Sequence, residues 1–134
     1  SILEMADVDS AELPQTLDGM SFVSLLEDHN NKVEVRPLYW HYPNAWGPSG
    51  PGIGSYSAVR EGPWKLIYFH EDQRLELYHL PSDIGEENNL TKENREQTLK
   101  LAQTLTEHLI KVDAQMPKFK ATGEQVPWPV AVIQ

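Results

Sequence analysis

Two neighbouring segments of alternating side chains place the strongest constraint on the fold of this chain. Residues 64–69 place Trp64, Leu66 and Tyr68 on one face and Lys65, Ile67 and Phe69 on the other, and residues 75–80 follow after the polar turn of residues 71–74. Alternation with a period of two predicts strands. A turn this short joins antiparallel neighbours, because parallel strands need a crossover of a dozen or more residues. The sequence therefore predicts an antiparallel meander.

Two further strands extend this meander toward the N-terminus. Residues 56–60 precede the compact turn of residues 61–63, Glu-Gly-Pro, and predict a hairpin with the strand that follows. Residues 38–42 alternate in the same way and are bracketed by prolines. Proline lacks the N–H that a sheet ladder needs and so marks strand ends. Four antiparallel strands are expected.

A long helix is predicted over residues 92–113. Thr91 is a good N-cap, and the helix carries one apolar stripe, which comprises Leu101, Leu105, Leu109 and Val112. A single stripe is typical of a helix that lies on a sheet. We therefore predict an α+β fold in which a roughly four-stranded antiparallel sheet carries a long C-terminal helix on one face.

The chain is expected to have three parts. Residues 1–30 form a linker segment with a short helix at about residues 22–26, and residues 31–117 form the sheet and helix subdomain. Residues 118–134 contain a Pro-Trp-Pro run and predict an extended tail. The first six residues are typical of the interior of a longer protein, so we expect this segment to leave a preceding domain.

Charge and composition exclude several functions. The sequence has 11 basic against 20 acidic residues, a formal charge of −9. Such a chain repels phosphate groups, which disfavours nucleic acid and anionic membranes as partners. No apolar run approaches the ~20 residues that span a bilayer. The absence of cysteine excludes disulfides, thiolate metal sites and a cysteine nucleophile.

Three ordered stretches resemble the C-terminal part of the sulfatase family, whose catalytic domain has an alkaline-phosphatase-like fold. They are residues 58–67, residues 76–90, and residues 3–6 together with 17–22. Residues 39–43, Tyr-Trp-His-Tyr-Pro, are most similar to bacterial arylsulfatase-like members. The resemblance implies a non-catalytic domain that completes the fold of a sulfate-ester hydrolase and borders its substrate pocket.

The resemblance also implies what the remainder of such an enzyme supplies. The partner would be an N-terminal catalytic domain with a formylglycine and a divalent cation, calcium in this expectation, acting on a sulfated small molecule or glycan. The parent enzyme would be periplasmic or secreted. Formylglycine forms within a C/S-x-P-x-R motif, and the only near match, residues 49–53, ends in Ile53 rather than Arg. No catalytic residue is therefore expected in this chain, which should be inactive alone.

The motifs themselves predict loop chemistry. Asp83 and Asn88 suit hydrogen bonds from side chain to backbone in a turn, and Arg60 or Lys65 could pair with an acidic residue at position 86 or 87. The sequon at Asn89 is interpreted as loop and cap chemistry rather than as a glycosylation site.

No metal site is predicted from the five histidines, because none forms a spaced pair with a further ligand. His70, beside Glu71 and Asp72, is interpreted as part of a solvated turn.

The candidate substrate-binding residues are His41, Asn44 and Trp46. Residues 43–55 form a long Gly- and Pro-rich connection, and long loops in compact domains are often functional. Trp46 could stack on a sugar ring, while His41 and Asn44 could donate hydrogen bonds to hydroxyl or sulfate oxygens. An equally supported alternative packs Trp46 against the catalytic domain.

Two other functions stay open: an autonomous carbohydrate-binding module and a protein-interaction module. We expect apolar residues on both sheet faces, with Tyr39, Ile67 and Phe69 opposite Trp40, Leu66 and Tyr68. An exposed apolar face of this kind predicts a possible dimer of the separate chain.

Overall fold

The computed structural model describes residues 1–9, 13–15, 17, 19–31, 36–44, 47 and 54–133. The chain divides into two compact units, residues 1–35 and residues 36–134.

The first unit contains two short helices, α1 (Ile2–Met5) and α2 (Val23–Glu27). The Ser1 hydroxyl accepts a hydrogen bond from the Phe22 N–H at 3.0 Å, which links the start of α1 to the start of α2. Neither helix has a buried residue, and apolar side chains such as Leu26 are exposed. The apolar residues of these helices are therefore not covered by their own unit.

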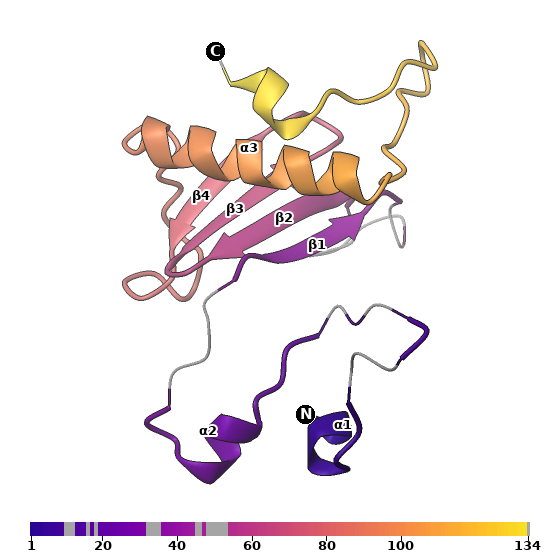
Figure 1. The fold of residues 1–134 in the computed structure, drawn as a ribbon. Coiled ribbons are helices and arrows are strands. Elements are labelled where there is room, and N and C mark those ends of the chain that lie inside the picture. The colour runs from indigo at the N-terminus through magenta and orange to yellow at the C-terminus, as the bar shows by residue number, and fades with distance from the viewer. Residues whose placement is uncertain are drawn as a thin grey trace. The chain divides into compact units, whose positions relative to one another are not determined.

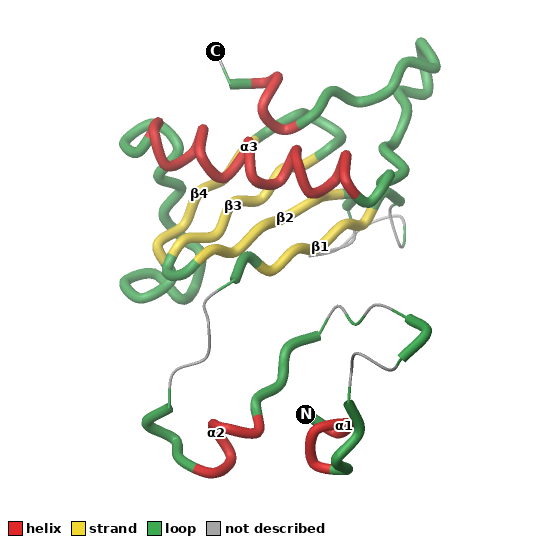
Figure 2. The backbone as a smooth tube through the Cα atoms, in the orientation of Figure 1, coloured by secondary structure: helices red, strands yellow, loops and turns green. Residues whose placement is uncertain are grey.

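The second unit is an antiparallel meander with a helix on one face (Figure 1). Its strands, β1 (Leu38–Tyr42), β2 (Tyr56–Glu61), β3 (Trp64–Phe69) and β4 (Leu75–His79), pair in chain order. The helix α3 (Arg95–Lys111) lies across the sheet (Figure 2). The predicted α+β fold is confirmed.

Glycine sets the geometry of the central hairpin. The turn between β2 and β3 pairs Glu61 with Trp64, and Gly62 has a φ of 56°. This left-handed conformation suits glycine, and Pro63 supplies the negative φ that a turn of the II′ kind needs at its second position. The two-residue turn fixes the register of β2 on β3.

The core lies between the sheet and α3. The register aligns Val59 with Leu66 and Leu66 with Leu77, and all three are buried. The buried stripe of α3 includes Leu101, Leu105 and Leu109. An ion pair of 2.7 Å between Lys100 Nζ and Glu61 Oε2 joins α3 to β2 at the border of this core.

The predicted distribution of β1 side chains between the two faces was wrong. Tyr39 aligns with Val59 and therefore faces α3, whereas Trp40 aligns with Ala58 and shares its face with Ile67. No short turn joins β1 to β2, so the sequence offered no rule that decides which side chains of β1 face α3.

The helix α3 begins later than predicted, after Asn94 rather than after Thr91. The amide oxygen of Asn89 accepts hydrogen bonds from the N–H groups of Thr91 at 3.0 Å and Leu77 at 3.1 Å. These bonds hold the connection against β4 as a turn, so the helix cannot start there. The same contacts occupy the Asn89 side chain, which supports its interpretation as a loop residue.

The loop between β4 and Asn89 is organised as the motifs predicted. The Asp83 carboxylate accepts the N–H groups of Glu87 at 3.0 Å and Asn88 at 2.9 Å, and these bonds hold the pKa of Asp83 below its usual range. Lys65 Nζ lies 2.6 Å from Glu86 Oε1 and ties the loop to β3.

The C-terminal segment packs on α3, where an extended tail was expected. A 3₁₀ helix at Pro129–Val132 packs along α3 (Figure 1). The Val130 N–H donates to Thr106 Oγ1 at 3.2 Å, and the Tyr68 hydroxyl donates to the Pro127 carbonyl at 2.9 Å. Val126 is buried, so burial of apolar side chains holds this segment in place.

Truncation of the helix stripe should distinguish core from surface. Leu105→Ala removes a fully buried side chain and should lower the free energy of unfolding by about 2–5 kcal/mol. Leu99→Ala, on the same helix but 38% exposed, should cost less than about 1 kcal/mol. Urea unfolding of the two variants measures both, and equal losses would contradict the assignment of this core.

Candidate functional site

The structure describes two of the three predicted substrate-binding residues. His41 is the second-to-last residue of β1, and Asn44 follows shortly after the strand with an exposed side chain. Trp46 lies outside the described residues, so its predicted stacking role stays a prediction.

Both ring nitrogens of His41 have partners within the chain. Nδ1 lies 2.8 Å from the Ser57 hydroxyl oxygen, and Nε2 lies 3.1 Å from the Gln115 carbonyl oxygen. Ser57 is the β2 residue directly opposite His41 in the register, and Gln115 follows α3. In this conformation His41 joins β1, β2 and the segment after α3. Of the two described candidate residues, Asn44 is therefore the one whose side chain is exposed and free to contact a ligand.

The hydrogen-bond chain continues from Ser57 into the core. Ser57 Oγ lies 2.8 Å from His70 Nε2, and both residues are buried, with 0% and 1% of their surface exposed. The interpretation of His70 as part of a solvated turn was therefore wrong. His70 continues the alternation of Leu66 and Tyr68, which directs its side chain to the face that α3 covers.

Burial controls the charge of His70. Desolvation, with a smaller contribution from His41, lowers the pKa of His70 to about 4. The Tyr68 ring contacts His70 edge-on with a centroid distance of 5.4 Å. His70 is therefore neutral at pH 7, and one of its nitrogens, Nδ1, is buried without a hydrogen-bond partner among the described residues.

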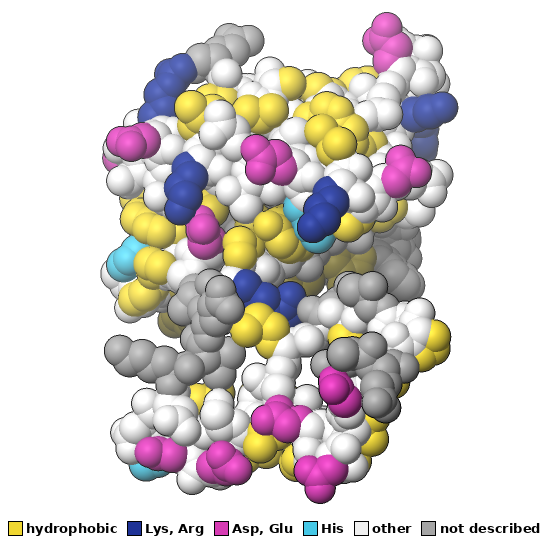
Figure 3. Space-filling view, in the orientation of Figure 1, with side chains coloured by type: hydrophobic (Ala, Val, Ile, Leu, Met, Phe, Trp, Pro, Cys, Tyr) yellow, Lys and Arg dark blue, Asp and Glu magenta, His cyan; other side chains and the backbone are white. Residues whose placement is uncertain are grey.

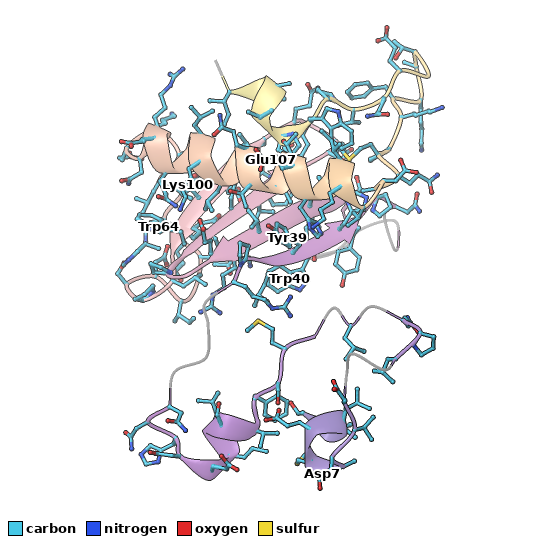
Figure 4. All side chains as sticks on the ribbon, viewed as in Figure 1. Asp7, Tyr39, Trp40, Trp64, Lys100 and Glu107 are labelled. Atoms are coloured by element: carbon cyan, nitrogen blue, oxygen red, sulfur yellow. The ribbon has the colours of Figure 1, made fainter. Side chains whose placement is uncertain are left out.

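A second histidine contact lies nearby on the same face. The rings of Tyr39 and His108 stack at a centroid distance of 3.6 Å with an interplanar angle of 2°. Desolvation, and then Lys111, lowers the pKa of His108. Figure 4 shows Tyr39 on the side of β1 toward α3 and Trp40 on the other side. The pair joins β1, one of the two edge strands, to the last turn of α3.

The face of the sheet opposite α3 carries a shallow hollow. It has a volume of about 320 Å³, and its lining includes Trp40, Tyr56, Arg60 and Ile84. Trp40 is 38% exposed and Ile84, on the loop after β4, is 84% exposed. We call these four residues the aromatic hollow.

The described residues do not supply a metal site. No three His, Cys, Asp or Glu side chains among them converge as a metal site requires. The near match to the formylglycine motif, residues 49–53, lies outside the described residues and lacks the required Arg. The donor set in this part of the chain therefore does not fit the cation or formylglycine that the resemblance implied.

Charge on the α3 side is mixed. Figure 3 shows acidic and basic side chains scattered over the helix and its surroundings. None of the helices in the described part of the chain is long and apolar enough to cross a membrane.

Sequence reasoning missed Ser57 and His70 as site residues. The alternation of β3 through Tyr68 was a signal that could have placed His70 on the α3 face. The contact of Ser57 with His41 can be predicted only from the register of β1 on β2, and no local feature of the sequence indicates that register.

The buried His70 predicts a specific loss of stability in acid. Its pKa is about 4 in the folded state against about 6.5 when unfolded, so the unfolded state binds more protons between these values. Stability should therefore fall as the pH drops below about 6.5 and level off below about 4, a total of about 3 kcal/mol from this residue.

Urea unfolding of the wild type and of His70→Gln at pH 7 and pH 4 measures this contribution. Glutamine keeps a donor but does not titrate, so its smaller loss of stability in acid isolates His70. His29→Ala, which removes an exposed histidine, is the matched control and should leave the pH dependence unchanged. If His70→Gln loses as much stability as the wild type, the buried neutral histidine is contradicted.

Comparison with known proteins agrees with this fold. The family described as "N-sulphoglucosamine sulphohydrolase, C-terminal" matches residues 1–115. A protein named sulfatase from Formosa agariphila is 31% identical over an alignment of 137 residues, and the match covers 93% of this chain and 25% of that protein. The solved structure of BT4656 in complex with its substrate D-glucosamine-2-N,6-O-disulfate is 26% identical, with a TM-score of 0.63. That match covers 83% of this chain and 22% of the other.

The chain thus spans about a quarter of the length of these relatives. The family match includes the first unit, the four strands and α3. The three ordered motifs fall in the first unit, in β2 and β3, and in β4 with the loop that follows it. On this agreement of sequence and fold, the chain belongs to the C-terminal domain family of the N-sulphoglucosamine sulphohydrolases, a family of sulfatase domains.

Proposed function

We propose that this chain acts as the non-catalytic C-terminal domain of a longer sulfatase that hydrolyses sulfate esters of sugars. The observation that carries the proposal is the family match over residues 1–115 together with relatives about four times as long. A sulfated sugar is favoured because the related solved protein holds D-glucosamine-2-N,6-O-disulfate as its substrate.

The chemistry of hydrolysis is proposed to lie in the rest of that polypeptide. The sequence contains no cysteine, and its one near match to a formylglycine motif lacks the Arg. A formylglycine nucleophile and a divalent cation, with calcium as the candidate, would therefore be supplied outside this chain. The chain's own residues would bind and orient the substrate rather than react with it.

Two apolar surfaces are proposed to contact the catalytic domain. One is the aromatic hollow opposite α3, where Trp40 and Ile84 are exposed. The other consists of the uncovered apolar side chains of α1 and α2. Burial of exposed apolar area against a larger domain is favourable by about 25 cal/mol per Å². The same surfaces would allow the separate chain to dimerise.

The substrate pocket is proposed to border the end of β1. Asn44 is exposed there and can both donate and accept hydrogen bonds with sugar hydroxyls, and Trp46 is proposed to stack on the ring. His41 contributes by anchoring the strand end, because both of its nitrogens are engaged. A net charge of −9 opposes sulfate groups, so these contacts would serve neutral parts of the sugar.

Sulfate release from D-glucosamine-2-N,6-O-disulfate and from an aryl sulfate tests the proposal. The 134-residue chain alone, with calcium added, should release none above background. The full-length polypeptide should turn over, and Asn44→Ala in it should raise KM for the sugar about tenfold, through lost hydrogen bonds to bound substrate, with little change in kcat.

Gln103→Ala, an exposed polar substitution on α3, is the matched control and should leave both constants unchanged. Hydrolysis by the chain alone would overturn the non-catalytic role. An unchanged KM in Asn44→Ala would overturn the contact at the end of β1. Tight sugar binding by the separate chain would instead favour an autonomous binding module.

A further inference from the structure

The hydrogen bonds between His41, Ser57 and His70 admit one arrangement of protons when both rings are neutral. The Gln115 carbonyl can only accept, so His41 Nε2 carries the hydrogen and His41 Nδ1 accepts. Ser57 must then donate its single hydrogen to His41 Nδ1. Toward the second ring the Ser57 oxygen can only accept, so His70 Nε2 carries a hydrogen as well. The chain of bonds therefore runs in one direction, from His70 through Ser57 to His41.

This chain of bonds joins the two strand ends that flank residues 43–55. His41 stands next to the last residue of β1, and Ser57 is the second residue of β2. The backbone N–H of His70 also donates a hydrogen bond, of 3.1 Å, to the carbonyl of Ser55, which lies immediately before β2. Through Gln115 the same bonds reach the segment after α3. We call His41, Ser57 and His70 the neck relay.

We propose that Ser57 and His70 are positioning residues, which hold the His41 ring in one orientation and thereby place the end of β1 and Asn44 for substrate contact. This inference rests on the proposed function, because it assigns the relay to the same binding edge.

The burial of the relay explains why the hydroxyl has no substitute. Ser57 is fully buried, so water cannot replace its hydrogen bonds at low cost. Without the hydroxyl, His70 Nε2–H would lack its acceptor and His41 Nδ1 would lack its donor. His41 is only half-buried, and without the Ser57 hydroxyl a single bond, to the Gln115 carbonyl, would hold its ring, so the ring could turn about that bond.

The first arm of the test measures the relay without any substrate. In the 134-residue chain with ¹⁵N-labelled histidine, at about pH 8, imidazole ¹⁵N shifts report which nitrogen carries the hydrogen. His41 and His70 should each show a single Nε2–H tautomer, whereas the exposed His29 should show the averaged shifts of a mixture. Ser57→Ala should change the His41 Nδ1 shift, because this nitrogen loses the hydroxyl that donates to it.

Ser82→Ala is the matched control, because the Ser82 hydroxyl lies at the same distance, 2.8 Å, from a histidine nitrogen, His79 Nδ1. It should leave His41 unchanged. Averaged shifts for His41 in the wild type, or an unchanged His41 Nδ1 shift in Ser57→Ala, would overturn the relay whatever the enzyme kinetics show.

The second arm measures steady-state kinetics of the full-length polypeptide with D-glucosamine-2-N,6-O-disulfate. Ser57→Ala and His70→Leu should each raise KM about tenfold with kcat within about twofold, because they disturb binding but not the reacting groups. His70→Gln keeps a donor at the position of Nε2 and should recover most of the wild-type KM. Ser82→Ala should have the wild-type constants.

The outcomes separate this inference from the proposed function. If Asn44→Ala raises KM while Ser57→Ala and His70→Leu do not, the positioning role is overturned and the proposed function stands. If none of the three changes KM, the binding edge at the end of β1 is overturned and the positioning role with it. If His70→Gln is as impaired as His70→Leu, the hydrogen bond is not the cause and the relay is overturned as a positioning device.

Discussion

Burial of one sheet face by α3 is the constraint on which the rest of the second unit depends. Leu101, Leu105 and Leu109 cover the row that contains Leu66 and Leu77, and the alternation of each strand then decides which side chains share that face. Tyr39 and His70 lie on the α3 side for this reason, and Trp40 lies on the other. The C-terminal segment packs beside α3 and is bonded both to Thr106 of the helix and to Tyr68 of β3.

The same constraint separates two kinds of surface. The α3 side contains the core and the neck relay, in which the Ser57 hydroxyl bonds to one ring nitrogen of each histidine. The opposite face keeps exposed aromatic and aliphatic side chains around the aromatic hollow. An apolar face exposed to solvent contributes no stability, whereas burial of the same face against a larger domain would be favourable in free energy.

Local features of the sequence predicted much of this fold. The strand bounds at residues 38–42 and 64–69 agree with the structure because prolines and short turns mark their ends. The start of α3 was missed because the Asn89 side chain binds backbone groups of β4, a contact between residues 12 apart. The side chains of β1 were assigned to the wrong faces because the long connection to β2 does not fix the register of this strand, which tertiary packing decides.

The candidate site was harder to predict than the fold. His41 and Asn44 follow from the composition and position of the long connection, but Ser57 joins the site only through cross-strand pairing. A serine in a strand carries no signal of its own, and a histidine after a strand is usually solvated. The positioning role proposed for them rests on the register, which places them in one hydrogen-bond chain.

The central claim is that this domain works while docked on the rest of a sulfatase through the face opposite α3. Hydroxyl-radical footprinting of the separate chain and of the full-length polypeptide tests it most directly, because it reports the exposure of single side chains. Trp40 and Ile84 should be oxidised in the separate chain and protected in the full-length polypeptide, while Leu99 and Ile110 on α3 should react equally in both. Equal oxidation of Trp40 and Ile84 in the two samples would contradict the account.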